Sequence, residues 1–123
     1  MEQYERGVEQ LVAMLGEERA HQVTGRFREL SPAFEQEAVA VVFGRTWART
    51  GIDRKTRSLC SIAILASLGR VGALRIVLEL ARNNGASREE ITEVVLQVAI
   101  YAGYPAALDA LAVLEGMADA AKG

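Results

Sequence analysis

The chain has 123 residues, 50% hydrophobic and 24% charged, a composition typical of one compact globular domain that excludes a disordered chain. Fourteen basic and 16 acidic residues give a formal charge of −2, so no basic field is expected to hold nucleic acid. The single cysteine, Cys60, cannot form an internal disulfide, and no secretory signal pattern opens the chain, which favours a cytoplasmic protein. No uncharged run reaches the roughly 20 residues of a bilayer span, so no membrane partner is expected.

The first half of the chain is expected to form helices, because apolar residues recur at intervals of three and four. The first expected helix covers residues 2–16 and ends at a glycine. A shorter helix over residues 17–24 is expected to stop at Gly25, before a separate stretch over residues 26–30. Ser31 followed by Pro32 predicts the start of the next helix, which runs to about residue 48.

The second half of the chain carries stronger helix boundaries. Asp53 can cap a helix over residues 54–68, and a helix over residues 71–83 follows. The sequence from Ser87 to Glu90 matches a capping box and predicts a helix that runs to about residue 102. A last helix is expected over residues 106–120. The sequence therefore predicts an all-α, single-domain bundle of about six or seven helices over residues 1–123.

The middle helices carry unusually few polar side chains. Between residues 59 and 68 the polar side chains are Cys60, Ser61 and Ser67 alone. A monomer of this length buries only about two thirds of its unfolded surface, so it lacks the shell to cover three apolar helices on all sides. We therefore expect a homo-oligomer, in which subunit contacts cover the apolar helices. A wide ligand pocket between the helices is the alternative explanation for their composition, and both can hold.

Several short motifs follow one another in an order that resembles a known family. They are residues 47–53 (WARTGID), 57–59 (RSL), 82–85 (RNNG), 89–93 (EEITE) and 101–107 (YAGYPAA). As a collinear set they resemble the 4-carboxymuconolactone decarboxylase family over roughly residues 4–113. The resemblance implies an all-α fold shared with alkylhydroperoxidase-D-like proteins, and subunits that assemble as trimers or hexamers.

The resemblance also implies where such proteins place their chemistry, and this chain differs at those positions. The thiol branch uses C-x-x-C with a histidine four residues later, and the corresponding positions here are Arg70, Ala73 and Val77, so thiol peroxidase chemistry is not expected. The decarboxylase branch has a histidine at the position of Val77, a carboxylate at Gly72 or Ala73, and an acidic residue at Arg45. We therefore hypothesise that this protein keeps the family's scaffold and cavity, and that its reaction has changed or has been lost.

Three side chains are the candidates for catalysis. Tyr101 or His21 can deliver a proton to an enolate-like intermediate, and Arg45 can hold an acid or enolate through a bidentate contact. Each also has a structural interpretation. Arg45 can be solvated or ion-paired between subunits, His21 can be a surface residue, and the Tyr101 hydroxyl can cap a loop.

Four more side chains are candidates to line a substrate cavity, namely Trp47, Val77, Cys60 and Arg75. Core packing is the alternative role for Trp47 and Cys60, and an ion pair with Glu79 is the alternative for Arg75. One histidine and the lack of H-x-x-x-H or C-x-x-C spacing predict no metal site. No motif for NAD, ATP or PLP is present, so no cofactor is expected.

Two functions fit these observations. The first is a cofactor-free enzyme acting on a cyclic carbonyl, aromatic or polyketide-like small molecule by decarboxylation, cyclisation, isomerisation or dehydration, which predicts a cavity lined by Tyr101, His21 or Arg45. The second is a non-catalytic ligand-binding or assembly protein, which predicts that packed side chains around Val77 close the former site. A peroxidase that uses Cys60 alone with an external thiol is the remaining, least favoured reading.

Overall fold

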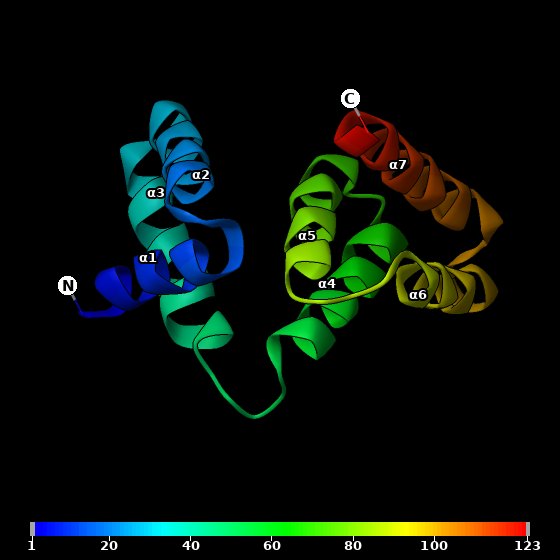
Figure 1. The fold of residues 1–123 in the computed structure, drawn as a ribbon, viewed down its shortest axis with the longest axis horizontal. Coiled ribbons are helices and arrows are strands. Elements are labelled where there is room, and N and C mark those ends of the chain that lie inside the picture. Colours follow the sequence, from blue (N-terminus) through cyan, green and yellow to red (C-terminus); the bar gives the residue numbers. More distant parts are fainter. Residues whose placement is uncertain (1, 123) are drawn as a thin grey trace. The chain divides into compact units, whose positions relative to one another are not determined.

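The computed structural model describes residues 2–122, with side chains up to residue 117, and this range is helical without a strand (Figure 1). The helices are α1 (Glu2–Leu15), α2 (Glu17–Leu30), α3 (Pro32–Glu37), the π-helical η1 (Ala38–Trp47), α4 (Arg54–Leu68), α5 (Val71–Asn83), α6 (Arg88–Ala102) and α7 (Tyr104–Lys122). They form two compact units, the first ending at Asp53 and the second beginning at Arg54. The expected all-α fold is confirmed, whereas the single domain stays a prediction.

Most predicted boundaries agree with the structure, and three expectations differ. The single helix expected from Pro32 to about residue 48 instead changes after Glu37 from α3 to the π-helical η1. The predicted break at Gly25 is wrong, because α2 continues through it to Leu30, with Val23 and Thr24 buried beside it. A glycine inside a helix costs only about 1 kcal/mol, which tertiary burial readily offsets. The last helix begins at Tyr104 rather than at residue 106, directly after Gly103, whose φ of 103° ends α6. None of the described helices is both long and apolar enough to cross a membrane.

The first unit is centred on a close crossing of α1 and η1. Gly7 of α1 lies against the backbone carbonyl of Val39, and Gly44 of η1 lies against the backbone carbonyl of Gln3. A Cβ atom at either glycine would overlap that carbonyl oxygen. The two helices therefore approach each other through backbone rather than through side chains, which only glycine permits.

A buried carboxylate links three helices of this unit. Glu35 of α3 is 1% exposed, accepts a hydrogen bond from the Tyr4 hydroxyl of α1, and forms an ion pair with Arg28 of α2 at 3.4 Å. The hydrogen bond to Glu35, together with burial, raises the pKa of Tyr4 above its usual value, because the neutral phenol is the form that donates. Ser31 caps the start of α3 by accepting from Phe34 N at 3.1 Å, as the sequence predicts.

The Tyr4 hydrogen bond predicts a pH-dependent stability. The pKa of Tyr4 is higher in the folded protein than in the unfolded chain, where it is near 10. The contribution of its hydrogen bond to the free energy of unfolding is therefore fully present below the unfolded pKa, and it is lost as pH rises through the folded pKa. Tyr4→Phe is expected to lower the free energy of unfolding by about 1–2 kcal/mol at pH 7. Urea unfolding at pH 7 and pH 11 measures this, with Tyr104→Phe as the control. A difference between wild type and Tyr4→Phe that does not shrink at pH 11 would contradict the assignment.

The second unit packs α4 to α7 around one apolar core, whose largest fully buried side chains include Ile62, Leu74, Leu78, Ile91, Val95 and Leu114. The predicted capping box is present, since Ser87 Oγ accepts from Glu90 N at 3.0 Å and Glu90 Oε1 accepts from Ser87 N at 2.9 Å. The same carboxylate pairs with Lys55 Nζ at 2.7 Å, and this pairing lowers the pKa of Glu90. The start of α6 is thereby tied to the start of α4.

Candidate ligand pocket between α4 and α6

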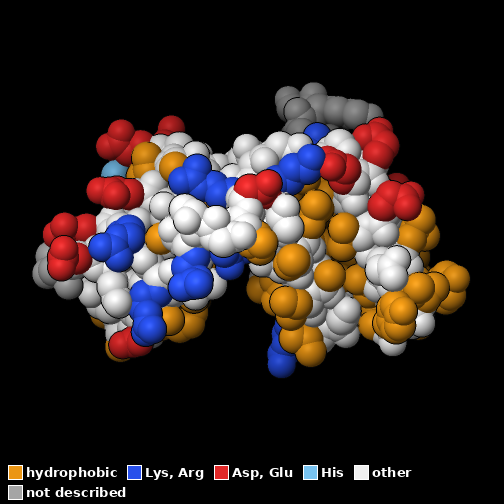
Figure 2. All heavy atoms as spheres, turned by 90° about the horizontal axis from the view of Figure 1, so that it is seen from below, with side chains coloured by type: hydrophobic (Ala, Val, Ile, Leu, Met, Phe, Trp, Pro, Cys, Tyr) orange, Lys and Arg blue, Asp and Glu red, His pale blue; other side chains and the backbone are white. Residues whose placement is uncertain are grey.

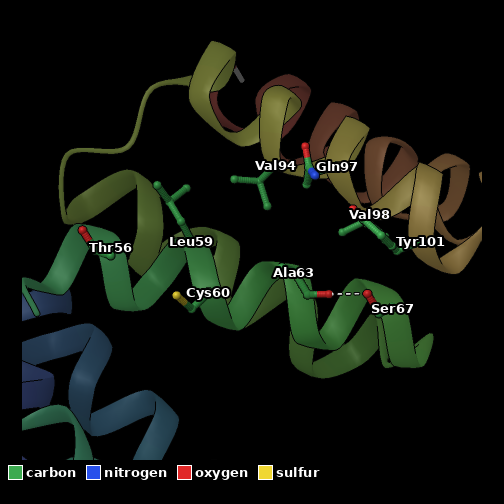
Figure 3. A pocket seen from close by; sticks show the side chains of 9 residues that line it. All are labelled: Thr56, Leu59, Cys60, Ala63, Ser67, Val94, Gln97, Val98 and Tyr101. Atoms are coloured by element: carbon green, nitrogen blue, oxygen red, sulfur yellow. Dashed lines mark hydrogen bonds between the residues drawn. The ribbon is translucent and has the colours of Figure 1, made fainter.

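A hollow of about 400 Å³ lies between α4 and α6, within the second unit (Figure 3). Leu59 points from α4 toward α6, and Val94 points from α6 toward α4, so both form the inner wall. The side chains that line the hollow are Thr56, Leu59, Cys60, Ala63 and Ser67 of α4, and Val94, Gln97, Val98 and Tyr101 of α6. We call this hollow the α4–α6 pocket.

The pocket follows from the spacing of residues on two helices. On α4, Thr56, Cys60, Ala63 and Ser67 recur at intervals of three or four and so form one stripe. A different side of α4 carries Ile62, which is fully buried in the core of the second unit. The stripe that faces the hollow is therefore not the one that packs into the core. Small side chains on the pocket stripe leave space beside α6 that larger ones would fill.

The pocket wall is mainly apolar and carries no charged side chain among its nine residues. Its polar groups include the Gln97 amide, the Tyr101 hydroxyl and the Ser67 hydroxyl, which donates to the carbonyl of Ala63 at 2.7 Å. Tyr101 is 84% exposed and Cys60 is exposed, so both reach the open side of the pocket. Such a site fits a ring or chain with few polar groups, oriented by one or two hydrogen bonds.

The structure brings two of the predicted site residues together and separates others from them. Tyr101 and Cys60 line the α4–α6 pocket. Val77 is half-buried on α5 and packs against the core of the second unit, and Arg75 is exposed on α5. Neither Val77 nor Arg75 lines this pocket.

The remaining three candidates belong to the first unit. His21 is exposed on α2, and Arg45 is exposed on η1. Trp47 is 7% exposed and stacks on Phe43 with ring centroids 6.2 Å apart, which favours core packing. Roles for these residues toward a ligand stay predictions.

Sequence reasoning missed most of the pocket wall, including Thr56, Gln97 and Val98. A signal was present, because α4 carries a stripe of small or weakly polar side chains at helical spacing, and the facing stripe of α6 is uncharged. Apolar helices are equally consistent with full burial, so spacing alone does not indicate a hollow. Among the described residues, no group of three or more His, Cys, Asp or Glu side chains is placed to hold a metal ion.

Comparison with known proteins identifies the family. The model of the carboxymuconolactone decarboxylase family matches residues 32–116, which include all of the α4–α6 pocket. The chain belongs to the carboxymuconolactone decarboxylase family. The resemblance found in the sequence motifs is thereby confirmed, although the order of any oligomer is not part of this finding.

Three similar proteins differ in how much of this chain they match. The 4-carboxymuconolactone decarboxylase of Acinetobacter baylyi is 33% identical over 114 residues, covering 93% of this chain and 85% of that protein. The nitrosuccinic acid decarboxylase npaB of Metarhizium robertsii is 37% identical over 75 residues, or 59% of this chain and 51% of that protein. An uncharacterised 15.0 kDa protein of Paracoccus denitrificans is 31% identical over 91 residues, or 72% of this chain and 68% of that protein.

Proposed function

We propose that this protein is a decarboxylase-type lyase that takes a small cyclic or aromatic-like acid into the α4–α6 pocket. The observation that carries the proposal is the position of Tyr101, whose phenolic hydroxyl can donate a proton, at the open side of an uncharged apolar pocket of about 400 Å³. The substrate class is an acid whose carboxylate is attached to the carbon beside a carbonyl or another electron-withdrawing group, as in a β-keto acid. Such a group accepts the electron pair released with CO₂, so the reaction needs no added cofactor.

Loss of CO₂ breaks the bond between the carboxylate and the substrate carbon, and the bonding electrons move into the neighbouring carbonyl as an enolate. The Tyr101 hydroxyl then gives its proton to that carbon, and the phenolate regains a proton from water. The amide of Gln97 lies in the same wall and can donate to the enolate oxygen, where charge develops.

The uncharged lining favours this reaction over simple binding of an acid. In the ground state the negative charge is concentrated on the carboxylate, and no lysine or arginine lines the pocket to stabilise it there. In the transition state the same charge spreads over the carbonyl system. Apolar surroundings disfavour the concentrated charge more, so they lower the barrier to CO₂ loss.

The names of two relatives support this substrate class. A carboxymuconolactone and nitrosuccinic acid are the acids in those names, and each combines a carboxyl group with an electron-withdrawing lactone or nitro group. Cyclisation, isomerisation or dehydration of a related compound would use the same proton donor and wall. We also propose that the protein is a homo-oligomer, a trimer or hexamer.

A non-catalytic ligand-binding role is the second candidate, and one observation favours it. Val77, at the position where the family resemblance implies a histidine, packs against the core of the second unit. A protein that has lost its base and retained a pocket would bind the same ligands without converting them.

A panel of cyclic β-keto acids and unsaturated lactone acids tests the proposal, with calorimetry for binding and CO₂ release for turnover. Ala63→Phe fills the pocket, and we expect it to reduce affinity and turnover at least tenfold. Ala112→Phe, on an exposed position of α7 outside the pocket, is the matched control. Binding without CO₂ release would select the non-catalytic role, and binding unaffected by Ala63→Phe would overturn the pocket as the site.

A further inference from the structure

The α4–α6 pocket is a groove that follows two helices rather than a compact hollow. On α4 its lining runs from Thr56 to Ser67, and at about 1.5 Å per residue this stretch is about 16 Å long. On α6 it runs from Val94 to Tyr101, which is about 10 Å. A sphere with the volume of the pocket, about 400 Å³, would be only about 9 Å across. A ligand that fills this space is therefore longer than it is wide.

Both helices begin at the same end of the groove and run in the same direction. Lys55, at the start of α4, pairs with Glu90, at the start of α6, with 2.7 Å between Nζ and Oε2. Ser67 and Tyr101 are the next-to-last residues of α4 and α6, so both belong to the other end. Figure 3 shows Thr56 at one end of the groove, and Ser67 with Tyr101 at the opposite end.

The two halves of the groove differ in polarity. Gln97 and Tyr101 place an amide and a hydroxyl group in the half where the helices end. Leu59 and Val94 point toward each other in the half where the helices begin, and Thr56 at its limit carries a methyl group as well as a hydroxyl. Such a wall matches a ligand with a polar head near Tyr101 and an apolar tail beside Leu59 and Val94.

We infer that the acid taken by the α4–α6 pocket carries an unbranched apolar tail of about eight carbon atoms, which lies along the groove from Tyr101 toward Thr56. The inference rests on the proposed function for the position of the acid group. A head with a carboxyl and a carbonyl group takes up about a third of the groove and leaves about 10 Å for the tail. With C–C bonds of about 1.52 Å, an extended chain advances about 1.25 Å per carbon, so about eight carbons fill that length.

The tail is expected to supply most of the affinity, because no charged side chain lines the groove to hold the head. Removing one methylene group fully from water improves binding about fourfold. The groove is open on one side, so a gain of roughly twofold per methylene is expected. Contacts to the tail lie away from the reacting carbon, and they hold the carboxylate beside Tyr101. A compact acid without a tail would leave the stretch beside Leu59 and Val94 in contact with water.

Apolar ligands can also adhere to exposed side chains outside the groove. Figure 2 shows hydrophobic side chains gathered over the second unit, which contains α4 and α6. Cys60 offers a way to separate the two kinds of binding, because it is exposed and lines the groove between Thr56 and Ala63. A larger side chain at Cys60 would block the half expected to hold the tail, and it would leave the rest of the surface unchanged.

Calorimetry of straight-chain 2-alkanones binding to the full chain tests the inference. These ketones are the products of CO₂ loss from 3-oxo acids, and they share one head while their tails differ in length. We expect the affinity to rise about 30-fold from 2-pentanone to 2-decanone. Cys60→Phe is expected to weaken 2-decanone binding at least tenfold and 2-pentanone binding no more than about threefold, with Cys60→Leu intermediate. Ala112→Phe, on an exposed position of α7 outside the groove, is expected to bind both as wild type does, and circular dichroism verifies that each variant is folded.

Three outcomes would overturn the inference. An affinity that does not rise with tail length would show that the ligand is compact. A rise that Cys60→Phe leaves intact would show that the tail adheres outside the groove, and equal losses for both ketones would place the head beside Cys60. None of these ketones can lose CO₂, so the result is separate from the test of the lyase. The expected series, without CO₂ release from the matching 3-oxo acids, would uphold the tail and reject the decarboxylase.

Discussion

Replacing Gly44 by alanine is expected to destabilise the first unit by more than about 3 kcal/mol. The added Cβ would overlap the backbone carbonyl oxygen of Gln3, so α1 and η1 would have to move apart. Backbone cannot rotate away as a flexible side chain can, and the separation would loosen the core around Val39 and Phe43, which are both buried. Gly7→Ala is expected to have a similar effect, because its Cβ would overlap the carbonyl of Val39.

Urea and thermal unfolding, followed by circular dichroism, measure the effect of Gly44→Ala. Gly25→Ala is the matched control, since Gly25 lies inside α2 with open space where a Cβ would be. It is expected to stabilise the protein by about 0.5–1 kcal/mol, because alanine has the higher helix propensity and loses less backbone entropy on folding. Unchanged stability of Gly44→Ala would contradict the close crossing of α1 and η1.

These three glycines show which parts of the fold a sequence can predict. Gly25 was predicted to break a helix, yet it lies within one, while Gly7 and Gly44 gave no local signal. Their roles depend on which helix approaches them in the folded state. Boundaries set by neighbours in sequence, such as the Ser87 and Glu90 capping box, were predicted correctly because their hydrogen bonds lie within one turn.

The candidate site also combines features that the sequence predicts with features that depend on the folded structure. The sequence predicts that α4 and α6 are apolar, and it selects Cys60 and Tyr101, but it does not predict that these two residues share one pocket. They are far apart in the chain, and their meeting depends on the packing of α4 against α6. The hollow itself depends on the size of Ala63 and its neighbours, because a larger side chain would fill it.

Tyr101→Phe is expected to reduce the rate of CO₂ release about 100-fold, measured on the panel compound that wild type converts fastest. Phenylalanine retains the ring that lines the pocket and removes only the hydroxyl that delivers the proton. The dissociation constant of the ligand is therefore expected to stay within about threefold of wild type, so the loss falls on kcat rather than on binding.

Tyr104 is also exposed but lies outside the pocket, and Tyr104→Phe retains its ring, so the turnover of this variant is expected to equal that of wild type. A structural role for the Tyr101 ring would leave Tyr101→Phe as active as this control, because both variants preserve packing. Full activity of Tyr101→Phe would thus assign the proton to another group, such as water admitted at the open side of the pocket. Loss of binding together with turnover would instead show that the hydroxyl orients the ligand, and the pocket would remain the site while Tyr101 would no longer be its acid.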